Sequence, residues 1–288
     1  MQILINEKKK KKTRKVDLSL SKFSSNIYSR VCLNLSFTNL TDIPFTLTSL
    51  YNLKILNLDN NQISFIPIEL FKLPLKELHL SNNQIKKLPL ELGQLSNLKV
   101  LNLQFNRLKN LPFTIGNLLN LEILNINHNY LTELPDNMIN MDNLKILYAN
   151  DNYLTFPIFL FRMERLKELY IDLVFDCTIP TNFTFIKNAN LKKLSITAFS
   201  GSETALSGTG TALSGTETFI NDLFYYITFP KLNELYLIGN NMNEIPNGIF
   251  NNKNIKLLQL DDNNISVIPS NIIKLKKLSK IYINNMVV

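Results

Sequence analysis

The chain has 288 residues, of which 45% are hydrophobic and 19% are charged, and its formal net charge is +8. Two cysteines, Cys32 and Cys177, cannot build a disulfide framework, and no apolar run approaches the ~18 residues of a membrane-spanning helix. Residues 1–15 hold seven basic residues and one acid and so carry +6, while the other 273 residues carry +2. The basic charge therefore belongs to the N-terminal segment.

The basic residues of this segment are Lys8, Lys9, Lys10, Lys11, Lys12, Arg14 and Lys15. Their mutual repulsion predicts a disordered tail over residues 1–15. Such a tail is a solubilising arm, a nuclear-import signal, or an electrostatic tether to nucleic acid or to an acidic membrane. No aromatic residue interleaves with the lysines, so base stacking is not supported.

A 23-residue unit recurs in the chain and is clearest at 98–120, LKVLNLQFNRLKNLPFTIGNLLN. Leu101 and Leu103 alternate with polar residues, as in a short strand. Asn106, at position 9, suits a turn because its amide both donates and accepts hydrogen bonds. Pro112, at position 15, suits the start of a short helix or 3₁₀ segment. A strand with a helical return is one coil of a solenoid.

One coil cannot bury its apolar face alone, so neighbouring units must stack on it. The pattern places units at 30–52, 53–74, 75–97, 98–120, 121–143, 144–165, 166–190, 191–231, 232–254 and 255–277, with a strand-only remnant at 278–288. Residues 16–29 are expected to form a degenerate starting coil. The predicted fold class is α/β, a single elongated domain over 16–288 of about ten to eleven units. We expect a curved solenoid with a parallel sheet on its concave side and short helical or 3₁₀ segments on its convex side.

The pattern L-x-x-L-x-L-x-x-N-x-L-x-x-L-P-x-x-I-x-x-L-x-x resembles that of leucine-rich repeat proteins. The proline at position 15 resembles the intracellular Ras-suppressor and phosphatase-scaffold subclass. This resemblance implies a non-enzymatic binding scaffold, with small GTPases or phosphatase catalytic subunits as partners. The Cys-rich end caps of extracellular relatives are not present, and no secretory signal is recognisable, so we expect a cytoplasmic or nuclear protein.

Asparagine at position 9 is expected to form a continuous structural ladder through the stack. Its members are Asn61, Asn83, Asn106, Asn129, Asn152, Asn240 and Asn263. Val174 and Phe199 replace this asparagine in two successive units, which predicts a local break or change of curvature within 166–231. The same region contains GSETALSGTGTALSGTET, residues 201–218. Its composition predicts a flexible low-complexity loop inserted into one coil.

No catalytic or metal-binding motif is present, so we expect no enzyme activity, no cofactor and no metal site. His79 and His128 occupy positions where the pattern places exposed residues, and the two cysteines are expected to be packing residues.

The concave surface is formed by positions 3, 5, 7 and 8 of each unit. These positions hold more acids than lysines: Asp59, Glu77, Asp151, Glu168, Asp172, Glu234, Asp261 and Asp262 against Lys193 and Lys280. Position 5 changes from amides to tyrosines at the sixth unit. We therefore expect a protein partner with a basic or mixed surface to bind at Tyr148, Asp151, Glu168, Tyr170, Asp172 and Tyr236. The alternative is that tyrosines simply suit exposed strands.

A rival function is a nucleic-acid- or membrane-associated adaptor that acts through the basic tail. The last residues include Ile281, Ile283, Met286, Val287 and Val288, with no polar cap. We expect this flank to be covered by a partner or by self-association, unless the chain continues beyond the sequence given.

Overall fold

The computed structural model describes residues 31–155, 157–174, 186–187, 190–198, 214–284 and 286–287. These residues belong to two compact units, Met1–Leu144 and Lys145–Val288. The basic tail, the expected starting coil at 16–29, Cys177 and insert residues 201–213 lie outside the described ranges, so the expectations for them stay predictions. No helix in the described ranges combines the length and the apolar character needed to cross a membrane.

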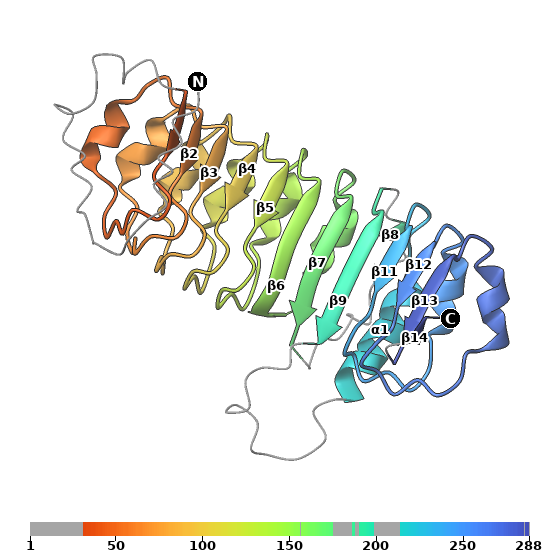
Figure 1. Cartoon of the computed structure of the whole chain (residues 1–288). Coiled ribbons are helices and arrows are strands. Elements are labelled where there is room, and N and C mark those ends of the chain that lie inside the picture. Colours follow the sequence, from red (N-terminus) through yellow and green to blue (C-terminus); the bar gives the residue numbers. More distant parts are fainter. Residues whose placement is uncertain are drawn as a thin grey trace. The chain divides into compact units, whose positions relative to one another are not determined.

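In the first unit, each repeat contributes one short strand and one 3₁₀ helix, and Figure 1 shows the two kinds of element in separate layers. The strands are β1 (Cys32–Asn34), β2 (Ile55–Asn57), β3 (Glu77–His79), β4 (Val100–Asn102) and β5 (Ile123–Asn125). The helices are η3 (Phe45–Ser49), η4 (Ile68–Lys72), η5 (Leu90–Gln94), η6 (Phe113–Asn117) and η7 (Asp136–Asn140). Consecutive strands pair in parallel with equivalent positions opposed, as Leu56 pairs with Leu33 and with Leu78.

A proline at position 15 precedes each 3₁₀ helix of the first unit. Pro67 has φ −66° and ψ 137°, which is extended backbone just before η4. Its carbonyl then accepts a hydrogen bond from the N–H of Leu70, three residues later, at 3.0 Å. Since proline has no N–H to satisfy, it can begin such a segment at no cost in hydrogen bonds. The same arrangement precedes the other 3₁₀ helices of this unit.

In the second unit, three of the strands are longer and an α-helix is present. The strands are β6 (Ile146–Leu154), β7 (Glu168–Leu173), β8 (Ile186–Lys187), β9 (Lys193–Ala198), β10 (Ile227–Thr228), β11 (Glu234–Tyr236), β12 (Leu257–Gln259), β13 (Lys280–Ile283) and β14 (Met286–Val287). The helices are η8 (Ile158–Arg162), α1 (Ser214–Tyr226), η9 (Asn247–Asn251) and η10 (Ser270–Lys274). The parallel order is β6-β7-β9-β11-β12-β13, and β14 pairs antiparallel with β13. β8 and β10 form a separate parallel pair.

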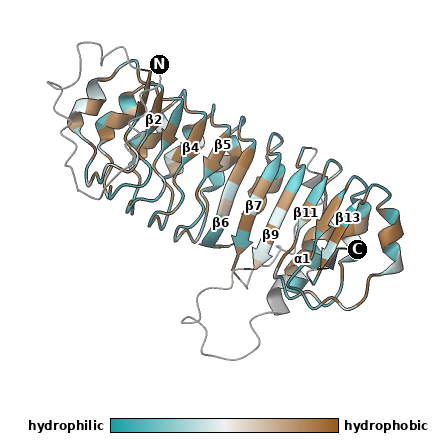
Figure 2. Cartoon of the chain, viewed as in Figure 1, coloured by the Kyte–Doolittle hydropathy of each residue, from teal (hydrophilic) through white to brown (hydrophobic). Residues whose placement is uncertain are grey.

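The core of each unit lies between its strands and its helices. The leucines and isoleucines at positions 1, 4, 6 and 11 are buried, except for the half-buried Leu40 and Leu278, and those of the repeat at 98–120 have no exposed surface. Along the longer strands β6, β7 and β9, hydrophobic residues alternate with hydrophilic ones, as the bands in Figure 2 show. This alternation places one side of each strand in the core and the other side on the surface.

The asparagines at position 9 are buried and bonded to backbone groups of two coils. Asn106 donates through Nδ2 to the carbonyls of Leu80 (2.8 Å) and Leu103 (3.0 Å), and its Oδ1 accepts from the N–H of Ile85 at 3.0 Å. Equivalent bonds hold Asn83 and Asn129. These amides therefore satisfy backbone groups that would otherwise be buried without partners.

A second row of asparagines, which sequence reasoning missed, lies at position 23. The side chain of Asn120 donates to the carbonyl of Ser96 at 2.8 Å, and that of Asn143 donates to the carbonyl of Leu119 at 2.8 Å. Asn254 makes the same contact with Pro230 at 2.6 Å. The signal was available in the sequence, because Asn recurs at the last position of most units.

The region where the first ladder loses its asparagines keeps its sheet. β7 and β9 pair in register over six residues, from Glu168↔Lys193 to Leu173↔Ala198. The longer strands give their backbone groups partners in the neighbouring strand, so a turn amide is not required there. The ladder resumes at Asn240, whose Nδ2 donates to the carbonyl of Ile196 at 2.8 Å.

The expected insert is partly helical, which corrects the prediction of a loop over 201–218. Helix α1 begins at Ser214 and includes the last five residues of that segment. The carboxylate of Glu217 accepts hydrogen bonds from the N–H and the Nδ2 of Asn243, at 2.9 and 2.7 Å. The buried side chains of Phe219, Ile220 and Leu223 anchor the helix. The composition predicted a loop because Gly, Ser and Thr dominate the segment. Burial of the apolar residues that follow the segment stabilises a helix, and this helix begins within the segment.

Candidate functional site

Two tyrosines stack on the strand surface of the second unit. Tyr148 of β6 and Tyr170 of β7 are opposed in the strand register. Their ring centroids are 4.8 Å apart, with 23° between the ring planes. Both side chains are partly exposed, because position 5 points away from the core. The result is a continuous aromatic surface that spans two strands.

A lysine extends this aromatic surface across a third strand. In register with Tyr170 and Tyr236, β9 has the small residue Ser195, which leaves space between the two rings. The side chain of Lys193 uses this space. Its ammonium lies 5.3 Å from the ring centroid of Tyr170 and 5.0 Å from that of Tyr236, within the range of cation–π attraction.

Two glutamates fix the tyrosine hydroxyl groups. The hydroxyl of Tyr170 donates to Glu168 at 3.0 Å, and that of Tyr236 donates to Glu234 at 2.9 Å. Glu234 also forms an ion pair with Lys193 at 3.1 Å. We call these six residues, Tyr148, Glu168, Tyr170, Lys193, Glu234 and Tyr236, the tyrosine–lysine patch.

The pKa values of the patch reflect these contacts. Burial, with a further contribution from Glu168, raises the pKa of Tyr170 to about 12, although the hydrogen bond with Lys193 opposes this change. Burial and Glu234 raise the pKa of Tyr236 as well. For Glu234, burial alone would raise the pKa, but the bonds from Lys193 and Tyr236 outweigh it and lower the pKa. For Lys193, burial opposes the charge, yet the bonds to Tyr170 and Glu234 raise the pKa of its ammonium.

Lys193 and Glu234 are therefore charged at neutral pH, and the hydroxyl groups of Tyr170 and Tyr236 are protonated. Among the residues that the structure describes, no cation pairs with the carboxylate of Glu168, whose only hydrogen bond comes from Tyr170. The surface thus offers aromatic faces and one carboxylate that is open to a cation from outside. Such a surface can hold a ligand by stacking and charge.

Of the predicted partner residues, Tyr148, Glu168, Tyr170 and Tyr236 lie together in this patch. Asp151 is exposed and has φ +52°, and it lies in the irregular stretch of β6 between Ala149 and Leu154. Asp172 requires a correction because its side chain is buried. It accepts hydrogen bonds from the N–H of Asp151 at 2.6 Å and from Asn150 at 2.7 Å, and burial raises the pKa of its carboxyl group. Asp172 therefore holds the irregular stretch of β6 in shape and is not available to a partner.

Several acidic side chains expected on the strand surface also form bonds within the chain, so fewer of them are available to a partner. Asp59 accepts from the N–H of Ser81 at 2.6 Å, Glu234 is paired with Lys193, and Asp261 is buried and accepts from Gln259. Counting the charges at each repeat position could not reveal these contacts. Sequence reasoning likewise missed the role of Lys193. A usable signal was the small Ser195, which occupies repeat position 5 between two units that have tyrosine there.

In the first unit, the amides at position 5 are engaged in local turns. Asn57 accepts from the N–H of Asp59 at 2.8 Å, and Asn102 accepts from the N–H of Gln104 at 3.1 Å. Cys32, expected to pack, is exposed instead at the start of β1. Its place at position 3 of the repeat puts it on the surface side of the strand.

Position 8 lies at a sharp bend in which most residues have positive φ. Asn60, Asn82 and Gly239 suit this conformation, but Phe37 and Phe105 also adopt it, at φ +58° and +53°. The ring of Phe105 stacks on His128, with centroids 3.9 Å apart. Within the described residues, no group of His, Cys, Asp and Glu could hold a metal ion.

Comparison with known proteins agrees with this architecture. One family model, described as "Leucine-rich repeat region", matches residues 90–208, and another, described as "Leucine Rich Repeat", matches 52–73 and 74–95. No curated protein sequence matches the chain.

Several solved structures are similar to the chain. The plant peptide hormone receptor RGFR1 in complex with RGF2 has 25% identity and a TM-score of 0.55, over 89% of this chain and 47% of the receptor chain. A TDR receptor has 26% identity and a TM-score of 0.59, over 88% and 42%. A leucine-rich repeat protein of Leptospira interrogans has 22% identity and a TM-score of 0.45, over 92% and 88%. The chain spans less than half the length of the two receptor chains.

The two family models together span residues 52–208, which is more than half of the chain. The repeat pattern and the stacked strand–3₁₀ coils agree with these matches, and the chain is a leucine-rich repeat protein.

Proposed function

We propose that this protein binds a protein partner through the tyrosine–lysine patch. Leucine-rich repeat folds generally mediate protein–protein interaction, and one similar structure is a receptor in complex with RGF2. The single observation that carries the proposal is the stack of Tyr148 on Tyr170, extended by Lys193 to Tyr236. Rigid aromatic side chains provide large contact areas at a small loss of conformational entropy.

The chemistry of the patch favours a partner segment with a basic residue. An arginine side chain can stack on an exposed tyrosine ring while its guanidinium bonds to Glu168. The hydroxyl groups of Tyr170 and Tyr236 are already bonded to glutamates, so binding would not need to order them. Resemblance to the Ras-suppressor subclass adds small GTPases and phosphatase catalytic subunits as candidates, and the binding assay below is open to both.

The test uses the full chain as bait, followed by direct measurement of the affinity for a purified captured partner. Tyr148→Ala combined with Tyr170→Ala is expected to weaken binding by more than tenfold. Glu168→Lys, which reverses the open charge, is expected to weaken it further and mainly to slow association. Tyr51→Ala is the matched control, because Tyr51 is 73% exposed and lies outside the patch. Equal affinities for the wild type and the double variant would exclude the patch as the binding surface.

A further inference from the structure

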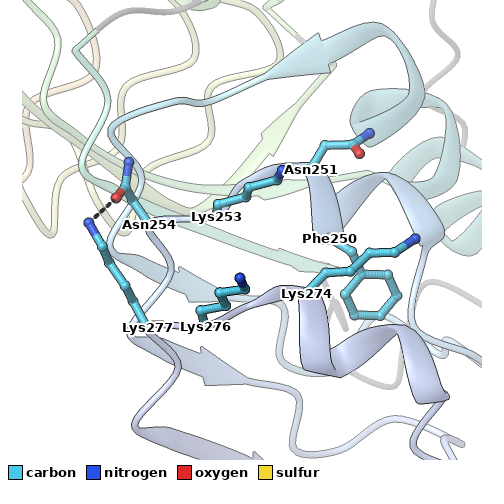
Figure 3. Close-up of a pocket in the computed structure, with 7 residues that line it drawn as sticks. All are labelled: Phe250, Asn251, Lys253, Asn254, Lys274, Lys276 and Lys277. Atoms are coloured by element: carbon cyan, nitrogen blue, oxygen red, sulfur yellow. Dashed lines mark hydrogen bonds between the residues drawn. The ribbon is translucent and has the colours of Figure 1, made fainter.

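A hollow lined by lysines lies on the helix side of the second unit, away from the strands that carry the tyrosine–lysine patch. It has a volume of about 550 Å³ and is lined by Phe250, Asn251, Lys253, Asn254, Lys274, Lys276 and Lys277. Figure 3 shows Lys253 and Lys276 between Lys277 at one end and Lys274 at the other. The residues come from the ends of η9 and η10 and from the turns that follow them.

The hollow has four cationic side chains and no acidic one among its lining residues. Lys277 donates to Oδ1 of Asn254 at 2.6 Å. Within the described part of the chain, the side chains of Lys253, Lys274 and Lys276 have no hydrogen-bond or ion-pair partner. Like charges gathered around one concavity repel one another, and a bound anion would relieve that repulsion.

The repeat itself does not require these lysines. Lys274, Lys276 and Lys277 occupy positions 20, 22 and 23 of their unit, and the same positions at 98–120 hold Asn117, Leu119 and Asn120. At position 23 the usual asparagine donates to a backbone carbonyl of the preceding coil, as Asn120 does to Ser96. Lys277 bonds instead to the side-chain oxygen of Asn254, as Lys231 does to that of Asn190 at 2.8 Å.

We propose that this hollow binds a compact anion with two or more phosphate groups. Lysine ammonium groups are common phosphate ligands, and several of them favour clustered phosphates over a single charge. A volume of about 550 Å³ lies within the range of small-molecule sites. The side-chain amide of Asn251 adds a polar group at the rim, and the buried ring of Phe250 forms an apolar floor. The phosphates belong to a soluble metabolite or to a lipid headgroup, and the site is independent of the proposed protein binding.

The test measures binding of the full chain to inorganic tripolyphosphate by calorimetry. A second arm measures binding to phosphatidylcholine vesicles with and without phosphatidylinositol bisphosphate. The variant is Lys253→Gln with Lys276→Gln, which removes two exposed charges that have no internal partner. The control is Lys86→Gln with Lys87→Gln, which removes two exposed charges from the first unit and leaves the basic tail unchanged.

We expect the wild type to bind tripolyphosphate saturably, the pocket variant to bind at least tenfold more weakly, and the control to change by less than twofold. If the same loss is seen only with the phosphoinositide vesicles, the ligand is a lipid headgroup. The proposal is overturned if neither probe binds saturably, or if the control weakens binding as much as the pocket variant does. The second result would show that overall charge, including that of the tail, provides the affinity. Melting curves of the variants confirm that each remains folded.

Discussion

Replacing Asn106 by alanine removes three buried hydrogen bonds, but their loss is not equally costly. The carbonyl of Leu80 also accepts from Asn83 at 3.1 Å, and the carbonyl of Leu103 also accepts from Asn129 at 3.0 Å. Both carbonyls therefore keep a donor. The N–H of Ile85 bonds only to Oδ1 of Asn106 and is left buried without a partner. A stranded buried donor costs about 1–3 kcal/mol, so we expect Asn106→Ala to lower the free energy of unfolding by about that amount.

The assay is urea denaturation followed by far-ultraviolet circular dichroism, because the chain has no tryptophan. With an m value of about 3 kcal/mol per molar urea, the midpoint should fall by roughly 0.3–1 M. Asn110→Ala is the matched control: it removes an exposed asparagine from the same coil and should be nearly neutral. Equal midpoints for the two variants would refute the argument that the ladder satisfies buried backbone groups.

Three further predictions concern packing, backbone conformation and ionisation. Gly248→Ala would place a Cβ 2.1 Å from the carbonyl oxygen of Phe224, so it should destabilise the chain by about 1–3 kcal/mol; an unchanged melting temperature would show that α1 does not pack against η9. Phe37→Asn should stabilise it by about 1 kcal/mol, because Phe37 has φ +58° and is 76% exposed, and a lower urea midpoint would contradict this. Tyr170 should titrate near pH 12, because its pKa is raised from 10 to about 12. Its contribution to stability is therefore complete below pH 10 and is lost as the pH rises through 12. NMR of ring-labelled tyrosines, with the signal assigned by Tyr170→Phe, measures this titration, and a signal that moved near pH 10 would disprove the prediction.

Repetition made most of the fold predictable. Apolar spacing and the prolines indicated the strands, the convex segments and the turn asparagines, because each repeat must present the same groups to its neighbours. The sequence left a short helix and a 3₁₀ segment as alternatives, and the proline carbonyl bonds decide for 3₁₀. The α-helix beginning at Ser214 was not predictable from composition, since packing in one irregular coil stabilises it.

The position of the candidate site was predictable from the sequence, but the contacts among its side chains were not. Tyr148 and Tyr170 were expected to be neighbours because they share a repeat position on adjacent coils. Counting the charges at each repeat position could not show that Asp172 bonds the irregular stretch of β6, since this depends on local backbone shape. The same count could not show that the side chain of Lys193 extends past Ser195 toward two tyrosines, because a long side chain at one repeat position can contact residues at another.

The most direct test of the proposed binding surface is hydroxyl-radical footprinting of the full chain with and without a purified captured partner. Oxidation of each tyrosine reports the exposure of its ring to solvent. We predict that Tyr148, Tyr170 and Tyr236 are protected in the complex, while Tyr51 is oxidised at the same rate in both states. Unchanged oxidation of the patch tyrosines, together with protection of a different surface, would contradict the central claim.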